Sequence, residues 1–210
     1  MPFFTNGMDF IFIIIILIMS VILHELSHGY AALFLGDNTA KHAGRLTLNP
    51  IKHIDPVGSI FIPLMLQILG TGIIFGWAKP VPYNPYNLRN QKWGELIVAA
   101  AGPITNLFLA VIFGLVIRFG INFGVSPAFI NLGSSIVILN IVLGLFNLIP
   151  IPPLDGSKIL FSILPLRFQG LKDRLEQFGF VIVLFFVFFL WDFVSPLIGW
   201  LYGLLTGLPF

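Results

Sequence analysis

Long apolar runs dominate the chain, and the polar residues between them are confined to short stretches. The runs cover residues 9–35, 59–75, 92–119, 131–149 and 178–205. A transmembrane helix needs about 20 predominantly apolar residues, so most of these runs have the length and composition of a membrane span. The pattern predicts an all-α polytopic membrane protein with about four to five hydrophobic segments.

Three departures from simple apolar runs refine this prediction. Residues 44–48 alternate between polar and apolar side chains and predict a short strand in the loop after the first segment. The run 59–75 is short and contains a proline and two glycines, which fits a re-entrant hairpin shielded by protein from lipid. Asp192 and Pro196 predict a kink or division within the run 178–205.

Composition and charge support the membrane assignment. Of 210 residues, 57% are apolar and only 10% are charged, whereas soluble domains carry roughly a quarter charged residues. The formal net charge of +2 comes from basic residues in short loops, which is typical of topology-setting charge and excludes a nucleic-acid-binding surface. We expect a lipid bilayer and no nucleic acid as partner, and one integral membrane domain over residues 1–210.

Basic residues also predict the orientation. Four of them lie between residues 158 and 174, which places this loop in the cytoplasm under the positive-inside rule. The loops on both sides of the run 59–75 are basic too, so this run is expected to dip into the membrane and return. The polar motifs described below then fall at one depth, near the cytoplasmic face.

A metal-binding motif interrupts the first apolar run. His24, Glu25 and His28 form a His-Glu-x-x-His sequence, in which the two histidines share one helix face and can converge on one zinc ion. Glu25 lies beside that face and suits the role of general base toward a metal-activated water. Ionisable groups in hydrocarbon cost about 2.5 to 3.5 kcal/mol each, so stray polar residues are a poor alternative explanation. Because the chain has no cysteine, a metal must be held by nitrogen and oxygen ligands.

A catalytic zinc site needs a third protein ligand, and Asp155 is the candidate. It follows a proline cluster and precedes Gly156, which allows the carboxylate to turn inward; an ordinary Asp at a helix end is the alternative. Asn147 could donate to the oxyanion of a tetrahedral intermediate or hold the substrate backbone, or simply bond a neighbouring helix. Asn106 has small neighbours and suits helix packing or substrate contact.

Other polar residues receive plainer interpretations. Asn140 is interpreted as a packing residue, and His42 and His53 as solvated side chains of the polar loop. Asp55 precedes a proline and is interpreted as a turn residue. None of the last three is assigned to the metal.

Five ordered motifs resemble the site-2 protease family of intramembrane zinc metalloproteases. They lie at residues 24–28, 44–56, 75–82, 101–106 and 147–156. The chain has no room for the PDZ or CBS domains that many members of that family carry, so it is similar to a short form.

The resemblance implies that His24, His28 and Asp155 bind one zinc ion per chain, that Glu25 activates water and that Asn147 assists nearby. It implies substrates that are themselves transmembrane helices, and a membrane-associated strand at residues 44–55 that presents them. The expected function is a zinc-dependent intramembrane endopeptidase of a prokaryotic plasma membrane. The alternatives are a membrane metal transporter or sensor that uses the same ligands, and an inactive scaffold that binds helices. The physiological substrate, the cleavage site and the oligomeric state do not follow from the sequence.

Overall fold

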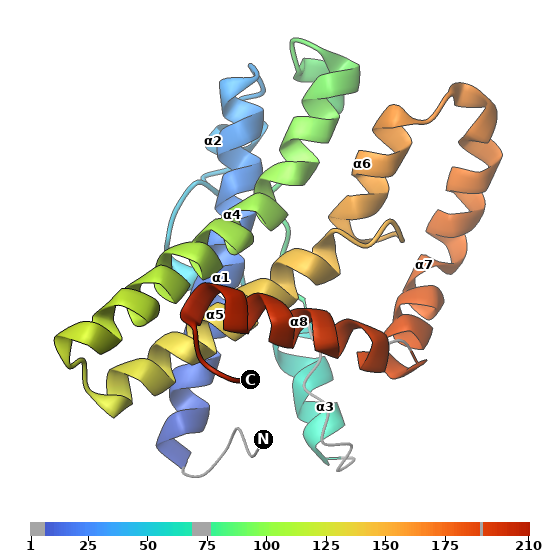
Figure 1. The fold of residues 1–210 in the computed structure, drawn as a ribbon. Coiled ribbons are helices and arrows are strands. Elements are labelled where there is room, and N and C mark those ends of the chain that lie inside the picture. Colours follow the sequence, from blue (N-terminus) through green and yellow to red (C-terminus); the bar gives the residue numbers. More distant parts are fainter. Residues whose placement is uncertain (1–6, 69–76, 190) are drawn as a thin grey trace.

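The computed structural model describes residues 7–68, 77–189 and 191–210, and within these ranges the chain is helical and forms no strand. Three helices are long and apolar enough to cross a membrane: α1 (Gly7–Phe34), α4 (Gln91–Gly120) and α5 (Pro127–Asn147) (Figure 1). The shorter elements are α2 (Thr39–His42), η1 (Pro50–Lys52), η2 (Pro56–Phe61), α3 (Ile62–Ile68), η3 (Pro85–Asn87), η4 (Ile121–Phe123), α6 (Asp155–Ile163), η5 (Leu166–Phe168), α7 (Gln169–Phe189) and α8 (Trp191–Thr206).

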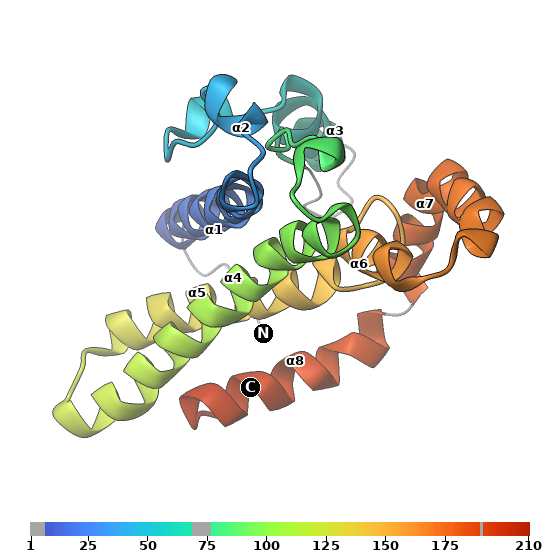
Figure 2. The ribbon, with the colours of Figure 1, turned by 90° about the horizontal axis from the view of Figure 1, so that it is seen from above.

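Helix α4 lies at the centre of the fold and packs against α1, α5, α6 and α8. Figure 2 shows α2 and α3 on one side of this centre and α8 on the opposite side. Buried apolar side chains of α4, α5 and α8 form the main core: Ala110, Ile117, Val137, Ile141, Ile198 and Tyr202. The long antiparallel contact of α4 with α5 is therefore the scaffold on which the other helices are placed.

Local sequence accounts for the ends of the α4–α5 hairpin. The Asn90 side chain caps α4 by accepting from the Trp93 backbone N–H at 3.1 Å, and Ser126 caps α5 in the same way. Pro127 occupies the first turn of α5, where its missing N–H costs nothing. Gly124 has φ of 72°, a left-handed conformation that glycine adopts without strain, and it ends the turn between the two helices.

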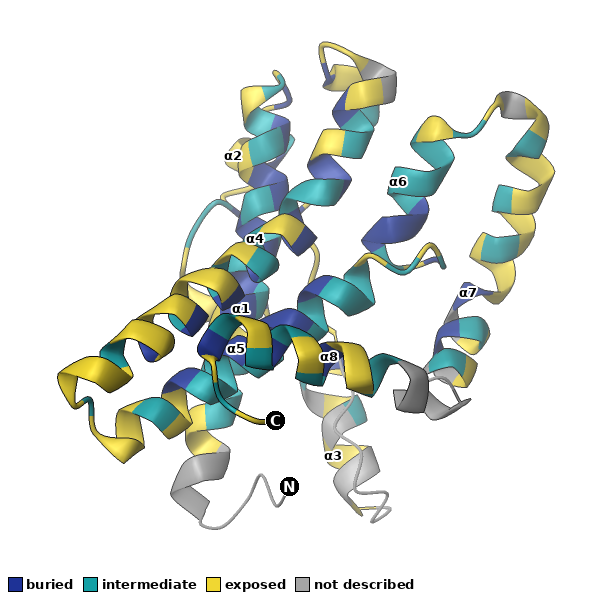
Figure 3. Cartoon of the chain, in the orientation of Figure 1, coloured by how far each residue is buried: buried dark blue, intermediate teal, exposed yellow. Residues whose placement is uncertain are grey.

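Much of the outer surface of the three long helices is exposed (Figure 3), and many of the exposed residues are large and apolar. Among them, Ile15, Phe108 and Phe119 are each more than half exposed. Such a surface requires an apolar solvent, so this is a membrane protein. The described residues hold three long apolar helices and one shorter apolar stretch, Val194–Thr206.

The strand expected at residues 44–48 is absent from the structure, where these residues form an irregular loop. The loop docks on the protein through two consecutive side chains. Arg45 turns inward and donates to main-chain carbonyls, while Leu46 packs so close to Gly29 of α1 that a Cβ on this glycine would lie 2.5 Å from it. Two adjacent side chains thus contact the protein without any strand pairing, and the alternation in the sequence does not correspond to a strand.

The re-entrant hairpin predicted for residues 59–75 falls partly outside the described residues, which omit 69–76. The two flanks of this stretch are hydrogen-bonded to each other. The Trp77 N–H donates to Gly58 O at 3.2 Å, and the Lys79 N–H donates to His53 O at 2.8 Å. The described flanks of the run are therefore held close together, and the re-entrant hairpin itself stays a prediction.

The last apolar run falls on two helices, and residue 190 between them lies outside the described residues. Helix α7 begins at Gln169 and ends at Phe189, and α8 resumes at Trp191, with Pro196 in its second turn. The basic stretch 158–174, expected as a loop, is largely helical and contributes to α6 and to the start of α7.

Candidate metal centre

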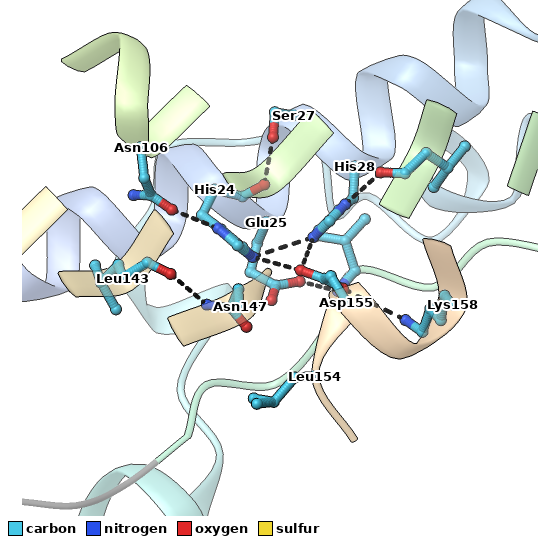
Figure 4. Close-up of polar contacts among 12 residues, drawn as sticks. His24, Glu25, Ser27, His28, Asn106, Leu143, Asn147, Leu154, Asp155 and Lys158 are labelled. Atoms are coloured by element: carbon cyan, nitrogen blue, oxygen red, sulfur yellow. Dashed lines mark hydrogen bonds and ion pairs between the residues drawn. The ribbon is translucent and has the colours of Figure 1, made fainter. Parts of the chain in front are cut away.

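Two helices bring the three expected ligands together. His24 and His28 lie one turn apart on α1, and Asp155 is the first residue of α6. The Nε2 atoms of the histidines are 3.1 Å apart, and each lies 3.1 Å from Asp155 Oδ2 (Figure 4). All three residues are buried, so the cluster lies inside the protein and within the apolar part of α1.

Hydrogen bonds on the far side of each ring fix which nitrogen carries the proton. His24 Nδ1 lies 2.5 Å from Asn106 Oδ1, and His28 Nδ1 lies 2.6 Å from Val98 O. Both partners are acceptors, so each neutral imidazole carries its hydrogen on Nδ1. Each Nε2 therefore presents a lone pair to the centre of the cluster.

This donor set fits a zinc ion. Two imidazole lone pairs and a carboxylate oxygen face one another at 3.1 Å, an arrangement that repels unless a cation lies among them. Ligands about 2.0 to 2.1 Å from a tetrahedral zinc are about 3.3 Å from one another, close to the observed separations. With nitrogen and oxygen donors only and three protein ligands, the cluster matches a catalytic zinc site with an open position.

Gly102 of α4 allows this helix to approach the two histidines. A Cβ at this position would lie 2.5 Å from His28 Nε2 and 2.6 Å from His24 Nε2, closer than real Cβ contacts. Any side chain larger than hydrogen would therefore enter the space between the ligands. The small residues around position 102 serve the close helix approach that the sequence predicts.

Asn106 belongs to a buried polar chain that the sequence did not reveal. Its amide accepts from His24 and donates to Asn140 Oδ1 at 2.9 Å, and Asn140 donates to Ser20 Oγ at 2.9 Å. Both asparagines are completely buried. These partners give Asn106 the packing role that the sequence suggests, and substrate contact by this residue stays a prediction. Asn140, interpreted as a packing residue, is the second member of the same chain.

Glu25 faces a different part of the protein from the histidines. Its Oε2 accepts the backbone N–H of Val81 at 2.7 Å, in the stretch between residues 77 and 84. The carboxylate has a second oxygen, and Figure 4 shows the side chain close to the cluster formed by His24, His28 and Asp155. The sequence places Glu25 next to the ligands, but nothing in it indicates the bond to Val81.

Asn147 is the last residue of α5 and is half-buried. Its Nδ2 donates to Leu143 O at 3.0 Å, four residues earlier in the same helix. The structure thus places Asn147 near the cluster (Figure 4) but gives it a partner in its own helix rather than among the ligands.

Residues around the centre complete its electrostatics. Lys158 Nζ lies 3.7 Å from Asp155 Oδ1, the oxygen that faces away from the histidines, and 5.5 Å from the centre of the Tyr83 ring. Burial raises the pKa of Tyr83 well above its usual range, and the carboxylates of Glu95 and Asp155 add to this, so the phenol stays neutral.

The two remaining histidines lie away from the cluster. His42 is exposed, as expected of a solvated side chain. His53 is buried, contrary to expectation, and its Nε2 donates to Thr47 O at 2.8 Å within the loop. Asp55 accepts from the Val57 and Gly58 N–H groups, which confirms it as a turn residue.

Comparison with known proteins agrees with this geometry. The sequence profile of peptidase family M50 matches residues 121–190. The protein YwhC of Bacillus subtilis, a zinc metalloprotease by name, is 42% identical over 192 residues, which cover 89% of this chain and 81% of the relative. The chain belongs to peptidase family M50. The motifs described above as similar to site-2 proteases are thus those of an M50 metalloprotease.

Further M50-like relatives are more distant. Rip2 of Mycolicibacterium smegmatis, also a zinc metalloprotease by name, is 35% identical over 83% of this chain and 65% of its own length. A zinc metalloprotease of Methanocaldococcus jannaschii is 29% identical over 80% of this chain and 39% of its own length. No solved structure matches the chain.

Proposed function

We propose that this M50 protein is a zinc-dependent endopeptidase that cleaves peptide bonds within or near transmembrane helices of membrane-anchored substrates. The observation that carries the proposal is the buried triangle of three possible metal-ligand atoms at 3.1 Å, two of them on an apolar helix that also carries a glutamate. The names of the relatives support zinc as the metal.

His24, His28 and Asp155 would hold one zinc ion per chain. Bound zinc supplies a Lewis acid for the scissile carbonyl and lowers the pKa of the attacking water. The Nδ1 bonds to Asn106 and Val98 keep both rings in the orientation that directs Nε2 inward.

Glu25 is the proton carrier in this proposal. Its carboxylate takes a proton from the water as the oxygen attacks the carbonyl carbon of the peptide. When the carbon–nitrogen bond breaks, the same carboxylate returns the proton to the departing nitrogen. One oxygen is already held by Val81, so the other is left for this transfer.

Asn147 is proposed to assist the substrate rather than the metal. A side-chain amide has two N–H donors. One donates to Leu143 O, and the second would donate to a peptide carbonyl of the substrate. Such a donor would orient the substrate backbone or stabilise developing negative charge on its oxygen.

The location follows from helix chemistry and charge. The exposed apolar surface of the long helices contacts lipid, and a substrate helix would approach the centre from the bilayer. The basic residues of α6 and of the start of α7 favour a cytoplasmic position for this end of the molecule, and with it the centre, in a prokaryotic plasma membrane.

The decisive experiment replaces Glu25 by Gln in detergent-purified protein, and measures bound zinc beside cleavage of a transmembrane peptide. We expect zinc to be retained and cleavage to fall by about 100-fold or more, the contribution of a general base. Full cleavage by Glu25→Gln would contradict the mechanism. Metal flux in proteoliposomes without any peptidase activity would instead favour the alternative function, a membrane metal transporter that uses the same ligands.

A further inference from the structure

Three sequence motifs that have no role in the mechanism meet beside Glu25. They are the loop at residues 44–50, the turn at 53–56 and the extended stretch at 77–82. The Arg45 guanidinium reaches the stretch through Nη2, which donates to Lys79 O at 2.7 Å and to Pro80 O at 3.2 Å. One side chain of the first motif thus holds two consecutive carbonyls of the third.

The second motif holds the same stretch through its backbone. The Lys79 N–H donates to His53 O at 2.8 Å, so Lys79 is bonded on both its N–H and its C=O. Two residues further on, Val81 gives its N–H to Glu25. The residues that receive these bonds, Lys79 and Pro80, therefore directly precede the one that holds the glutamate.

Val81 is suited to present one hydrogen bond and no other. It lies between Pro80 and Pro82, which have no N–H and fix their own φ angles, so Val81 carries the only backbone donor among residues 80–82. Its side chain is buried against α1, where a Cβ on Gly29 would lie 2.8 Å from Val81 Cγ1. Gly29 and Glu25 are four residues apart and share a helix face, so Val81 is seated on the face that carries the glutamate.

Burial of Arg45 is energetically unfavourable by itself, so its position must be stabilised by other interactions. It is buried, with a relative exposure of 7%, and within the described part of the chain its Nε has no hydrogen-bond partner. A buried charge with an unsatisfied donor destabilises a protein. The bonds to Lys79 and Pro80 are what this arrangement gains.

We infer that Arg45 is a positioning residue for Glu25. It fixes the carbonyls of Lys79 and Pro80, and this places the Val81 N–H so that Glu25 keeps one carboxylate rotamer beside the metal ligands. The inference rests on the proposed function for its kinetic consequence, but the placement of Val81 can be measured without any catalysis.

The first test is Arg45→Lys, which keeps the positive charge but lacks the planar fork that reaches two carbonyls. Arg118→Lys is the control, because Arg118 also donates to a distant backbone carbonyl, Leu204 O at 2.5 Å, at the far end of α4. In zinc-loaded protein, we expect Arg45→Lys to lower kcat about tenfold or more, with little change in KM or zinc affinity. Arg118→Lys should leave all three unchanged.

A second, activity-independent readout is hydrogen exchange at Val81, the only exchangeable amide in residues 80–82. Arg45→Lys and Glu25→Ala should each speed this exchange, and Arg118→Lys should not. Unchanged exchange at Val81 in Arg45→Lys would overturn the inference, even if the proposed protease activity were confirmed. Faster exchange in a protein that cleaves no peptide would leave the positioning in place and reject the proposed function.

A third variant tests the N–H itself by replacing the amide with an ester at residue 81. The matched control is an ester at Asn84, whose N–H also donates to a carboxylate at 2.7 Å, that of Asp37. Both esters remove one bond of the same kind and length, but only the one at residue 81 should lower kcat. Equal losses of kcat from the two esters would show a structural role only and overturn the inference.

Discussion

The two sides of helix α1 hold the candidate site residues His24 and Glu25 in different ways. On one side, His24 is oriented by amides of α4 and α5 that are completely buried between helices. On the other, Glu25 is held by a backbone N–H from an extended stretch that contains no helix. The proposed metal ligands thus depend on packed helices, whereas the proposed proton carrier depends on a loop.

This difference has a functional meaning under the proposed mechanism. A metal site requires ligand positions that do not change, and helix packing with a satisfied polar network provides them. A general base must meet water and substrate, and loops held by a few bonds adjust more readily than packed helices. We call the packed helices around His24 the helix side, and the extended stretch that holds Glu25, with the loops bonded to it, the loop side. Substitutions on the helix side should therefore change zinc affinity, and those on the loop side should change turnover.

The largest effect on the helix side is expected from Gly102→Ala. The new methyl group would lie close to the Nε2 atoms of both His24 and His28, so zinc affinity should fall by more than about 100-fold. This exceeds the roughly 10- to 100-fold loss that is typical when a residue hydrogen-bonded to a metal ligand is replaced. Isothermal titration or competition with a chelator measures this. Gly170→Ala, at a helical position where a Cβ meets nothing within 4 Å, is the control and should bind zinc normally. Normal zinc affinity in Gly102→Ala would show that α4 does not confine the ligands.

A smaller effect on the same side is expected from Asn106→Leu. It removes the acceptor that orients His24 and leaves Asn140 without its partner, so zinc affinity should fall about 10- to 100-fold. Asn106→Asp keeps the acceptor for His24 and should recover part of the affinity. If Asn106→Leu lowered only thermal stability and left zinc affinity unchanged, the amide chain would serve packing alone.

The sequence pattern predicts the candidate metal ligands of the helix side, but not the long-range hydrogen bonds that orient them. The spacing of His24 and His28 fixes a common helix face, and the proline cluster before Asp155 indicates an inward turn; the structure brings all three together. The sequence predicts packing for Asn140 and packing or substrate contact for Asn106, but it does not reveal their partners, Ser20 and His24, which lie 120 and 82 residues away. No local pattern encodes such contacts.

The loop side was predicted less well, because its order does not come from a repeating backbone pattern. The alternation at residues 44–48 predicts a strand, whereas the structure has an irregular loop held by an inward arginine and, at the next position, a leucine packed against Gly29. His53 was expected in solvent and is buried, since its carbonyl and ring both bond other parts of the loop. Loop conformation of this kind depends on individual tertiary bonds.

The loop side also predicts a response to acid, centred on Asp37 just beyond α1. Burial alone raises the pKa of this carboxyl group, but hydrogen bonds from Thr39, Asn84 and Asn87 outweigh it and hold the pKa below its usual range. The stabilisation is therefore complete above the unfolded-state pKa of about 3.9 and is lost as the pH falls through the lower folded-state value. Hydrogen exchange at Thr39 and Asn84, corrected for intrinsic rates, should accelerate in acid before that of the α4–α5 core.

The corresponding substitution, Asp37→Asn, should destabilise the loop side by about 1 to 3 kcal/mol at neutral pH, as expected when buried donors lose their acceptor. Zinc affinity should stay close to that of the parent protein. Asp173→Asn is the control, because Asp173 is exposed and accepts a single side-chain bond, from Gln169. Equal thermal stability in the two variants would argue against Asp37 as an anchor of the loop.

The smallest effect is expected from Lys158→Met, which tests whether charge at the surface contributes to the helix side. The Lys158 side chain is 41% exposed and lies 3.7 Å from Asp155 Oδ1, the oxygen that does not face the histidines. Exposed ion pairs contribute about 0 to 1 kcal/mol, so zinc affinity should change by less than about fivefold. Lys172→Met removes a similar exposed pair, with Glu176 at 3.9 Å, and should leave zinc affinity unchanged. A loss in Lys158→Met as large as that in Asn106→Leu would contradict the comparison, because the ligands would then depend on a surface charge as much as on buried helix packing.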